Sequence, residues 1–266
     1  MSDTLGYRGY IIDLDGTTYL GDQPIRGAAE AIAELRARGA RVAFVSNNPR
    51  QRREAYARKL RGMGIAASAD DVVNSAAVMA FWLREQAPGA SVYVVGEPPL
   101  IEELKQAGFD VRDTGPGADF VVLAFDTTFT YDKLKQAHDA VLAGARLVAT
   151  NPDRACPMPG GELLPDCAAI IGAVEGATGR RVEVVVGKPS PIMLRAALSR
   201  LNLPAEHCLM VGDRLETDVA MGRAAGMDTA LVLTGVTTRK MLRESDLAPT
   251  YVVESIAQVP ALRRKR

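Results

Sequence analysis

Short apolar runs alternate with longer segments of helical periodicity along almost the whole chain. Runs of four or five apolar residues are typical of strands buried on both faces, because such strands need no polar side chains. Residues that recur at i, i+4 and i+7, as Ala28, Ile32 and Leu35 do, predict helices that bury one face. The pattern predicts strands at 10–15, 42–45, 72–73, 92–95, 120–123, 147–149, 182–186, 208–211 and 231–233. It predicts helices at 28–38, 51–62, 75–85, 99–107, 131–143, 167–177, 191–201 and 215–225.

This alternation predicts an α/β fold built from βα units around a Rossmann-like parallel sheet. From about residue 78 the pattern restarts and forms a self-contained α/β block of a size typical of a domain. After that block the chain returns to the pattern of its first third, in which apolar runs end in polar residues. We therefore predict one domain made of residues 1–77 and 183–266, interrupted by a smaller inserted α/β domain at 78–182.

Polar side chains stand where four of the predicted strands end. Two carboxylates spaced i, i+2 leave a regular strand on the same face, so we expect Asp13 and Asp15 to point the same way. Taken alone, this stretch could equally be a strand followed by a polar turn at Gly16. Because the carboxyl ends of parallel strands share one edge of a sheet, the four ends together predict a single site. Its members would be Asp13, Asp15, Ser46, Asn47, Lys188, Asp213 and Asp218.

The residue types of this set suit phosphoryl transfer through a covalent aspartyl phosphate. A pair of carboxylates needs a cation or a shared proton, and oxygen ligands from Asp13 and Asp213 match Mg²⁺. With the ion present, Asp13 would stay ionised and could attack phosphorus. Asp15 could protonate the departing oxygen and afterwards take a proton from water. Lys188 and Ser46 would neutralise and orient the phosphoryl oxygens.

Composition narrows the class of protein and of partner. Hydrophobic residues make up 47% of the 266 residues and charged residues 24%, which are ordinary globular values and exclude disordered and fibrous classes. Lys+Arg and Asp+Glu both number 32, so no excess charge favours nucleic acid or an anionic membrane as a partner. Three cysteines without metal-type spacing, a polar N-terminus and the lack of a membrane-length apolar run predict a cytoplasmic protein with reduced thiols.

The order of these motifs resembles the haloacid dehalogenase (HAD) phosphatase superfamily. The resemblance rests on Asp-Leu-Asp-Gly-Thr at 13–17, an apolar strand ending at Ser46, then Lys188 and the acids after Gly212, and it extends over nearly the whole chain. Four further stretches narrow it to the NagD-like or p-nitrophenyl phosphatase branch, which carries a large α/β cap between the second and third motifs. They are Val94–Glu97, Ala149–Asp153, Val186–Pro191 and Leu233–Val236.

The resemblance implies a phosphoric monoester hydrolase and assigns roles to individual residues. Asp13 would be the nucleophile and Asp15 the general acid and base. Mg²⁺ would be held by Asp13, the backbone carbonyl of Asp15 and Asp213, with Asp218 in support. The implied phosphate-binding residues are Ser46, Asn47 and Lys188.

The inserted domain would be the cap, which covers the site and selects the leaving group. Its specificity loop would lie between residues 151 and 169, where Arg154 is either a contact for an anionic substrate or a surface residue paired with an acid of the loop. Nothing in the loop separates sugar phosphates from nucleotides, phosphoglycolate or pyridoxal phosphate, so the expected partner is a small phosphorylated metabolite. The branch is compatible with a homodimer. The loop residues singled out are Arg154, Cys156, Met158 and Pro159.

Two other functions fit the same residues. A phosphotransferase or mutase would pass the phosphoryl group to a sugar hydroxyl rather than to water. A phospho-accepting signalling domain or sensor also uses an aspartate with Mg²⁺. Against the second stand Asp15, which can activate water, and the inserted domain, which suits a small-molecule site.

Overall fold

A computed structural model describes residues 6–157 and 162–264 of the chain. The described residues form two compact units. The first consists of the chain up to Ser46, Arg53–Val73 and the chain from Lys188 onward, and the second of Asn47–Arg52 and Asn74–Gly187. The assignment of 78–182 as a cap stays a prediction.

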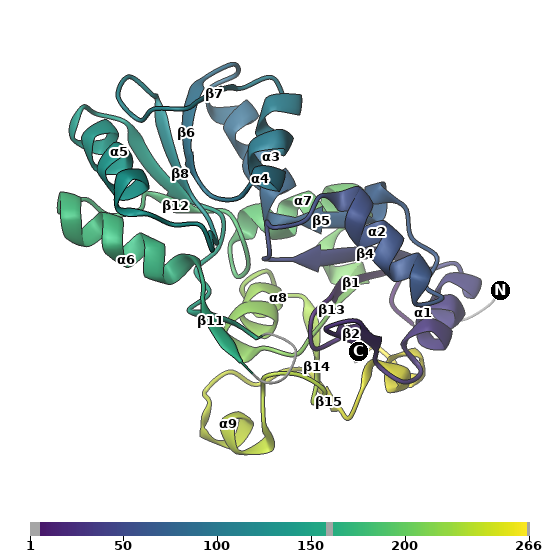
Figure 1. The fold of residues 1–266 in the computed structure, drawn as a ribbon. Helices are drawn as coiled ribbons and strands as arrows, with labels where there is room; N and C mark the ends of the chain where they lie inside the picture. Colours follow the sequence, from purple (N-terminus) through teal and green to yellow (C-terminus); the bar gives the residue numbers. More distant parts are fainter. Residues whose placement is uncertain (1–5, 158–161, 265–266) are drawn as a thin grey trace. The chain divides into compact units, whose positions relative to one another are not determined.

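The first unit contains a six-stranded sheet and a short antiparallel hairpin (Figure 1). Its strands are β1 (Gly9–Asp13), β2 (Tyr19–Leu20), β3 (Gln23–Pro24), β4 (Arg41–Ser46), β5 (Val72–Asn74), β13 (Cys208–Gly212), β14 (Asp228–Val232) and β15 (Tyr251–Val253). The order in the sheet is β15-β14-β13-β1-β4-β5, and β2 and β3 form the hairpin directly after β1. β1 pairs in parallel with β4 and β13, so the carboxyl ends of these three strands meet at one edge.

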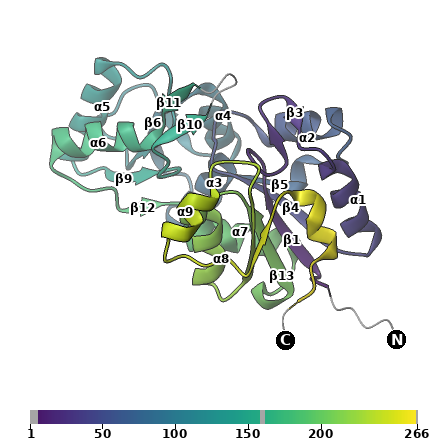
Figure 2. The same ribbon diagram turned by 90° about the horizontal axis from the view of Figure 1, so that it is seen from below.

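Helices cover both faces of this sheet. They are α1 (Ala28–Ala37), α2 (Arg53–Gly62), α7 (Pro191–Leu201), α8 (Ala220–Ala224) and α9 (Arg239–Glu244), with a π-helical turn at Leu215–Val219 and 3₁₀ turns at Ala69–Asp71, Ala205–His207 and Ile256–Ala261. Tyr10 and Ile12 of β1 belong to one buried cluster with Ile32 and Leu35 of α1. Figure 2 shows α7 and α8 on the other side of β1 and β13 from α1. Both faces of the sheet are therefore apolar, which leaves the strand ends for polar residues.

The second unit repeats this architecture around a five-stranded sheet. Its elements are α3 (Ser75–Gln86), β6 (Ser91–Val95), α4 (Pro98–Gln106), β7 (Asp110–Arg112), β8 (Phe120–Leu123), α5 (Tyr131–Leu142), β9 (Arg146–Ala149), β10 (Ala155–Pro157), β11 (Leu163–Pro165), α6 (Cys167–Thr178) and β12 (Val184–Val185). The sheet order is β12-β9-β8-β6-β7, and all pairs are parallel. One buried cluster joins this sheet to α5 and α6. On α3, Trp82 packs edge-to-face on Phe120 of β8, with ring centroids 6.2 Å apart.

Local signals in the sequence explain several helix ends. Ser190 caps α7, its hydroxyl accepting a hydrogen bond from the backbone N–H of Ile192 at 3.3 Å, and Pro191 is the first helical residue. The helix ends at Leu201 and is followed by the C-cap residue Asn202, which adopts a left-handed conformation. Asn74 caps α3 in the same way, through the N–H of Ala77. None of the helices within the described ranges is long and apolar enough to span a bilayer.

The predicted α/β fold with parallel sheets is confirmed, and three details of the prediction were wrong. The predicted strand at 182–186 is only Val184–Val185, and it pairs with β9 in the second sheet rather than with the sheet that contains β1. The predicted helix at 215–225 begins with a π-helical turn and is α-helical only at Ala220–Ala224. The strand predicted at 10–15 stops at Asp13.

Candidate active site

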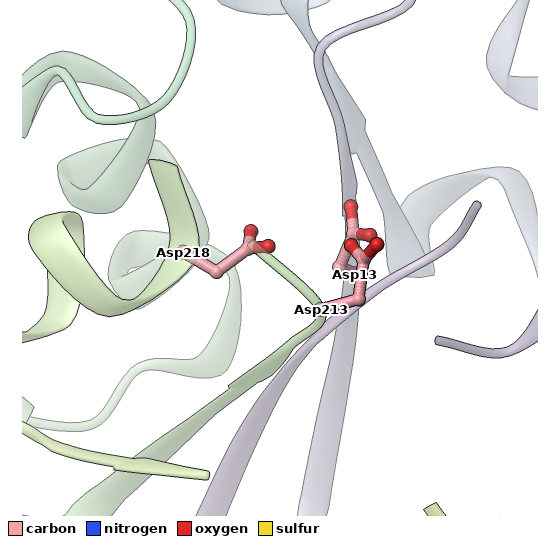
Figure 3. Close-up of side chains that lie close together, drawn as sticks. All are labelled: Asp13, Asp213 and Asp218. Atoms are coloured by element: carbon pink, nitrogen blue, oxygen red, sulfur yellow. The ribbon is translucent and has the colours of Figure 1, made fainter. Parts of the chain in front are cut away.

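Three buried aspartates meet at the carboxyl edge of the first unit's sheet. Asp13 is the last residue of β1, Asp213 follows β13 directly, and Asp218 lies in the π-helical turn. Figure 3 shows the carboxyl groups of Asp13 and Asp213 close together at the ends of their strands, with Asp218 pointing toward them. Each offers one carboxylate oxygen within 4.8 Å of the other two. Three acids so close together need positive charge among them.

Lys188 supplies one such charge. Its Nζ donates to Oδ1 of Asp13 at 2.5 Å and to Oδ1 of Asp218 at 2.7 Å, and its side chain is only 4% exposed. Burial by itself would lower the pKa of Lys188, but the two carboxylates outweigh burial and raise it, so the side chain is an ammonium. Lys188 lies in the segment after β12, a strand of the second sheet. The prediction that it follows a strand of the sheet that contains β1 was therefore wrong.

The charges of the cluster still do not balance, because three carboxylates surround one ammonium. Burial, together with the charges of Asp218 and Asp213, raises the pKa of Asp13 well above its usual range, although Lys188 opposes the shift. Burial and the charge of Asp218 also raise the pKa of Asp213 to about 6. Both shifts mean that the full set of negative charges is favourable only with a further cation present.

The oxygens of Asp213 show where a cation fits. Its Oδ2 accepts a hydrogen bond from the backbone N–H of Val236 at 2.6 Å. Its Oδ1 is buried, and no described residue donates to it. Burying a carboxylate oxygen without a hydrogen-bond donor is unfavourable unless a metal ion or a water molecule binds to that oxygen. The cluster offers only oxygen ligands, which is the donor set that Mg²⁺ requires, so the residues fit the predicted ion.

Asp15 lies apart from the three-aspartate cluster. Because β1 stops at Asp13, the argument from strand periodicity does not apply to Asp15, which sits in a turn where the N–H of Thr18 bonds the carbonyl of Leu14 at 2.8 Å. The Asp15 side chain is accessible to solvent, yet the protein packed around it raises its pKa, with Lys59 and a hydrogen bond from Tyr19 opposing the shift. The backbone of Asp15 also forms an isolated bridge with Tyr19.

The two residues predicted after β4 lie in different surroundings. Ser46 ends β4 and is buried, one position beyond Val45, which pairs with Asp13. It therefore lies at the same sheet edge as the aspartates. Asn47 belongs to the second unit, where its Nδ2 donates to Oδ2 of Asp153 at 2.9 Å.

The predicted specificity loop is described only in part. Arg154 is exposed, and no described acid forms an ion pair with it, so of the two alternatives for this residue the pairing with an acid of the loop is not observed. Cys156 lies in β10, which pairs with β11 in an antiparallel hairpin. Met158 and Pro159 lie outside the described residues.

Two features beside the site were not predicted as parts of it, although one of them overlaps the motif Leu233–Val236, on which the resemblance partly rests. One is Tyr19, which is buried next to Asp15 and has the ammonium of Lys59 4.2 Å from its ring centroid. The other is the loop at Thr234–Thr237, which contacts Asp213. The glycine at 235, three residues after the end of β14, was the available signal, because a glycine in a loop often marks a close backbone approach.

Known proteins resemble the chain over nearly its full length. The haloacid dehalogenase-like hydrolase family matches residues 10–110, and a HAD-hydrolase-like family matches residues 185–259. The sugar-phosphatase AraL of Bacillus subtilis (strain 168) is 41% identical over 254 residues, which cover 96% of this chain and 92% of AraL.

Solved structures agree with this assignment. A p-nitrophenyl phosphatase from Archaeoglobus fulgidus superposes with a TM-score of 0.91 and 38% identity, covering 97% of this chain and all of that one (100%). NagD from E. coli K-12 superposes with a TM-score of 0.86 and is 33% identical in sequence. The match covers 95% of this chain and 98% of NagD. A third structure is the glycerol phosphate phosphatase Rv1692 from Mycobacterium tuberculosis, solved in complex with magnesium. It superposes with a TM-score of 0.87 and is 35% identical in sequence, and the match covers 95% of this chain and 76% of Rv1692. The chain therefore belongs to the haloacid dehalogenase-like hydrolase family, and within it to the NagD-like branch of phosphoric monoester hydrolases.

Proposed function

We propose that the chain is a Mg²⁺-dependent phosphatase that hydrolyses small sugar phosphates through an aspartyl phosphate on Asp13. The observation that carries the proposal is the convergence of Asp13, Asp213 and Asp218, two of which, Asp13 and Asp218, pair with Lys188, while Oδ1 of Asp213 is buried and without a described donor. The sugar-phosphate class comes from relatives that are named sugar phosphatases, such as AraL.

In this proposal the ion is held by Asp13, Asp213 and the backbone carbonyl of Asp15, with Asp218 in support. When bound, Mg²⁺ neutralises charge on the phosphoryl group. Lys188 contacts Oδ1 of Asp13, so a phosphoryl group bound to Asp13 comes within reach of the ammonium. Ser46, at the same sheet edge, gives a hydroxyl that can donate to a phosphoryl oxygen. Asn47 stays a third candidate for phosphate binding.

The reaction has two steps. In the first, an oxygen of Asp13 forms a bond to phosphorus while the bond from phosphorus to the sugar oxygen breaks, and protonated Asp15 gives its proton to that oxygen. In the second, Asp15 takes a proton from water as the water oxygen attacks phosphorus, and the bond to Asp13 breaks. The raised pKa of Asp15 supports the first role, because a larger fraction of this carboxyl is protonated than in free aspartate.

A phosphate-release screen tests this function. The full-length protein is given a panel of sugar phosphates, nucleotides, phosphoglycolate and pyridoxal phosphate, in Mg²⁺ and in EDTA. We expect release from sugar phosphates in Mg²⁺ and loss of release in EDTA. Transfer of phosphate to an added sugar without net release would instead make the protein a phosphotransferase, and a stable phosphoprotein without turnover would make it a sensor.

Three expectations about the whole protein accompany the proposal. Residues 78–182 would act as a cap that selects the leaving group, and exchanging residues 151–169 with those of a relative should then change the substrate preference. A homodimer would appear in sedimentation as twice the mass of the 28.4 kDa chain. A cytoplasmic location would be tested by fractionation of cells that express the protein.

A further inference from the structure

A loop that follows β14 joins two of the segments that form the site. The hydroxyl of Thr234 donates to the backbone carbonyl of Gly16, in the turn after β1, at 2.6 Å. Two residues later, the backbone N–H of Val236 donates to Oδ2 of Asp213 at 2.6 Å, and the N–H of Thr237 donates to the backbone carbonyl of Asp213 at 3.2 Å. The loop therefore contacts the Asp13–Gly16 turn and Asp213 at once.

These contacts leave the two oxygens of the Asp213 carboxylate with different surroundings. Oδ2 accepts the strong, short hydrogen bond from Val236, whereas Oδ1 is buried and has no described donor. A carboxylate with one oxygen fixed by a backbone N–H cannot rotate freely about its last bond. The loop therefore determines which oxygen of Asp213 is available to a cation and where that oxygen lies.

Glycines make this close approach sterically feasible. A Cβ on Gly235 would lie 2.0 Å from Oδ2 of Asp213 and 2.5 Å from its carboxyl carbon. A Cβ on Gly16 would lie 2.6 Å from the same Oδ2 and 3.1 Å from the Cα of Gly235. Gly16 also has a φ of +85°, which side chains rarely tolerate. The backbone of the loop, the turn and the Asp213 carboxylate thus pack together without any intervening side chain.

We propose that the loop Thr234–Thr237 is a positioning element for the divalent cation, which acts by fixing the Asp213 carboxylate through Gly235, the N–H of Val236 and the hydroxyl of Thr234. This inference rests on the proposed function, because it takes Asp213 as a ligand of the ion. Groups that orient metal ligands change metal affinity by about 10- to 100-fold when they are removed.

The test measures Mg²⁺ affinity directly, by calorimetry on the metal-free full-length protein, rather than through activity. In Gly235→Ala the new methyl group must displace the Asp213 carboxylate, and we expect Mg²⁺ to bind at least about 10-fold more weakly than in the wild type. Gly62→Ala is the matched control, because a Cβ there meets nothing within 4 Å in the same unit. It should bind Mg²⁺ as the wild type does.

Thr234→Val is a second variant that keeps the β-branched shape and removes only the hydroxyl, so it serves if Gly235→Ala does not fold. We expect its Mg²⁺ affinity to fall by about 10-fold, while the thermal midpoint in EDTA stays close to that of the wild type. A merely structural loop would give the reverse, a lower midpoint with unchanged affinity.

The outcomes separate this inference from the function on which it rests. If wild-type protein binds no Mg²⁺ and releases no phosphate, the proposed function fails. If wild-type protein binds Mg²⁺ and both loop variants bind it equally well, the loop has no positioning role although the function stands. Weaker binding in the folded variants, with Gly62→Ala unchanged, supports the inference.

Discussion

Lys188 places a positive charge in direct contact with two aspartates of the site. Its ammonium contacts both Asp13 and Asp218, and all three groups are buried. Breaking a buried ion pair by removing one partner is costly, because the remaining charge loses both water and its counter-ion. The same ammonium lies beside the carboxylate that we expect to carry the phosphoryl group.

Replacing Lys188 with methionine keeps an apolar stem and removes the charge. We expect the metal-free variant to lose about 3 kcal/mol or more of its free energy of unfolding, because Asp13 and Asp218 lose their partner. Urea denaturation in EDTA measures this loss. Lys59→Met, which removes a more exposed ammonium, is the control and should change stability less. An unchanged midpoint for Lys188→Met would show that the ion pairs do not stabilise the fold.

Burial raises the pKa of Asp15, and Tyr19 is one of the groups that oppose the shift. Its hydrogen bond stabilises the ionised carboxylate, so Tyr19→Phe should raise the pKa of Asp15. Asp15 must be protonated to donate to the leaving oxygen, and the basic limb of the pH profile of kcat/KM should therefore move to higher pH, by up to about one unit. The measurement uses a sugar phosphate, whose leaving group is poor. Tyr131→Phe, at an exposed tyrosine, is the control, and a limb that stays in place or moves to lower pH would remove Tyr19 from this role.

Among the elements, the central strands of both sheets could be predicted from sequence, whereas the edge strands β7 and β15 could not. β1, β6, β8 and β13 are buried along their whole length, so each appears as an uninterrupted apolar run. β7 and β15 lie at sheet edges, where one side has no neighbour, and their exposed or half-buried residues give no such run. The six-residue α9 was missed because it is too short to show a helical period.

Some parts of the candidate site could likewise be predicted from sequence, and others could not. Each of Asp13, Lys188, Asp213 and Asp218 could be located from a strand end or a motif, and the structure brings them together. The contacts of Tyr19 and of the Thr234–Thr237 loop depend on tertiary approach, which sequence periodicity does not encode. The wrong assignment of 182–186 has a similar cause, because an apolar run does not specify which sheet it joins.

The π-helical turn depends on a glycine at the end of β13. A Cβ on Gly212 would lie 2.2 Å from Cγ of Asp218, so Gly212→Ala must displace either the strand end or the turn. We expect a loss of about 2 kcal/mol or more in the free energy of unfolding, by thermal or urea denaturation. Gly172→Ala, inside α6 with nothing within 4 Å of the new methyl, should be neutral or stabilise by up to about 1 kcal/mol. Equal stability of the two variants would contradict the packing described for Asp218.

At the scale of the whole molecule, the chain builds its site from segments that are far apart in sequence. Lys188 and Asp13 are separated by 175 positions, yet both belong to the first compact unit, as do Asp213 and Asp218. The second unit is an insertion with its own sheet and buried cluster. A cation bound to the aspartates should therefore stabilise one unit directly.

Hydrogen exchange can locate that stabilisation. At Mg²⁺ concentrations about 100 times the dissociation constant, binding adds about 2.7 kcal/mol to the stability of the structure that holds the ion. We expect slower exchange at the ends of β1 and β13 and in the π-helical turn, with β6, β8 and β9 unchanged. Slower exchange of equal size in both sheets, or none in the first, would contradict the placement of the ion.

Phosphorylation of Asp13 during turnover can be detected by acid-quenched labelling. The protein is mixed with a sugar phosphate that carries a radioactive phosphoryl group in Mg²⁺, quenched within one turnover and digested. We predict label on the peptide that contains Asp13, sensitive to hydroxylamine and absent in Asp13→Asn, which also loses turnover. Label on another residue, or an Asp13→Asn variant that still releases phosphate, would contradict it.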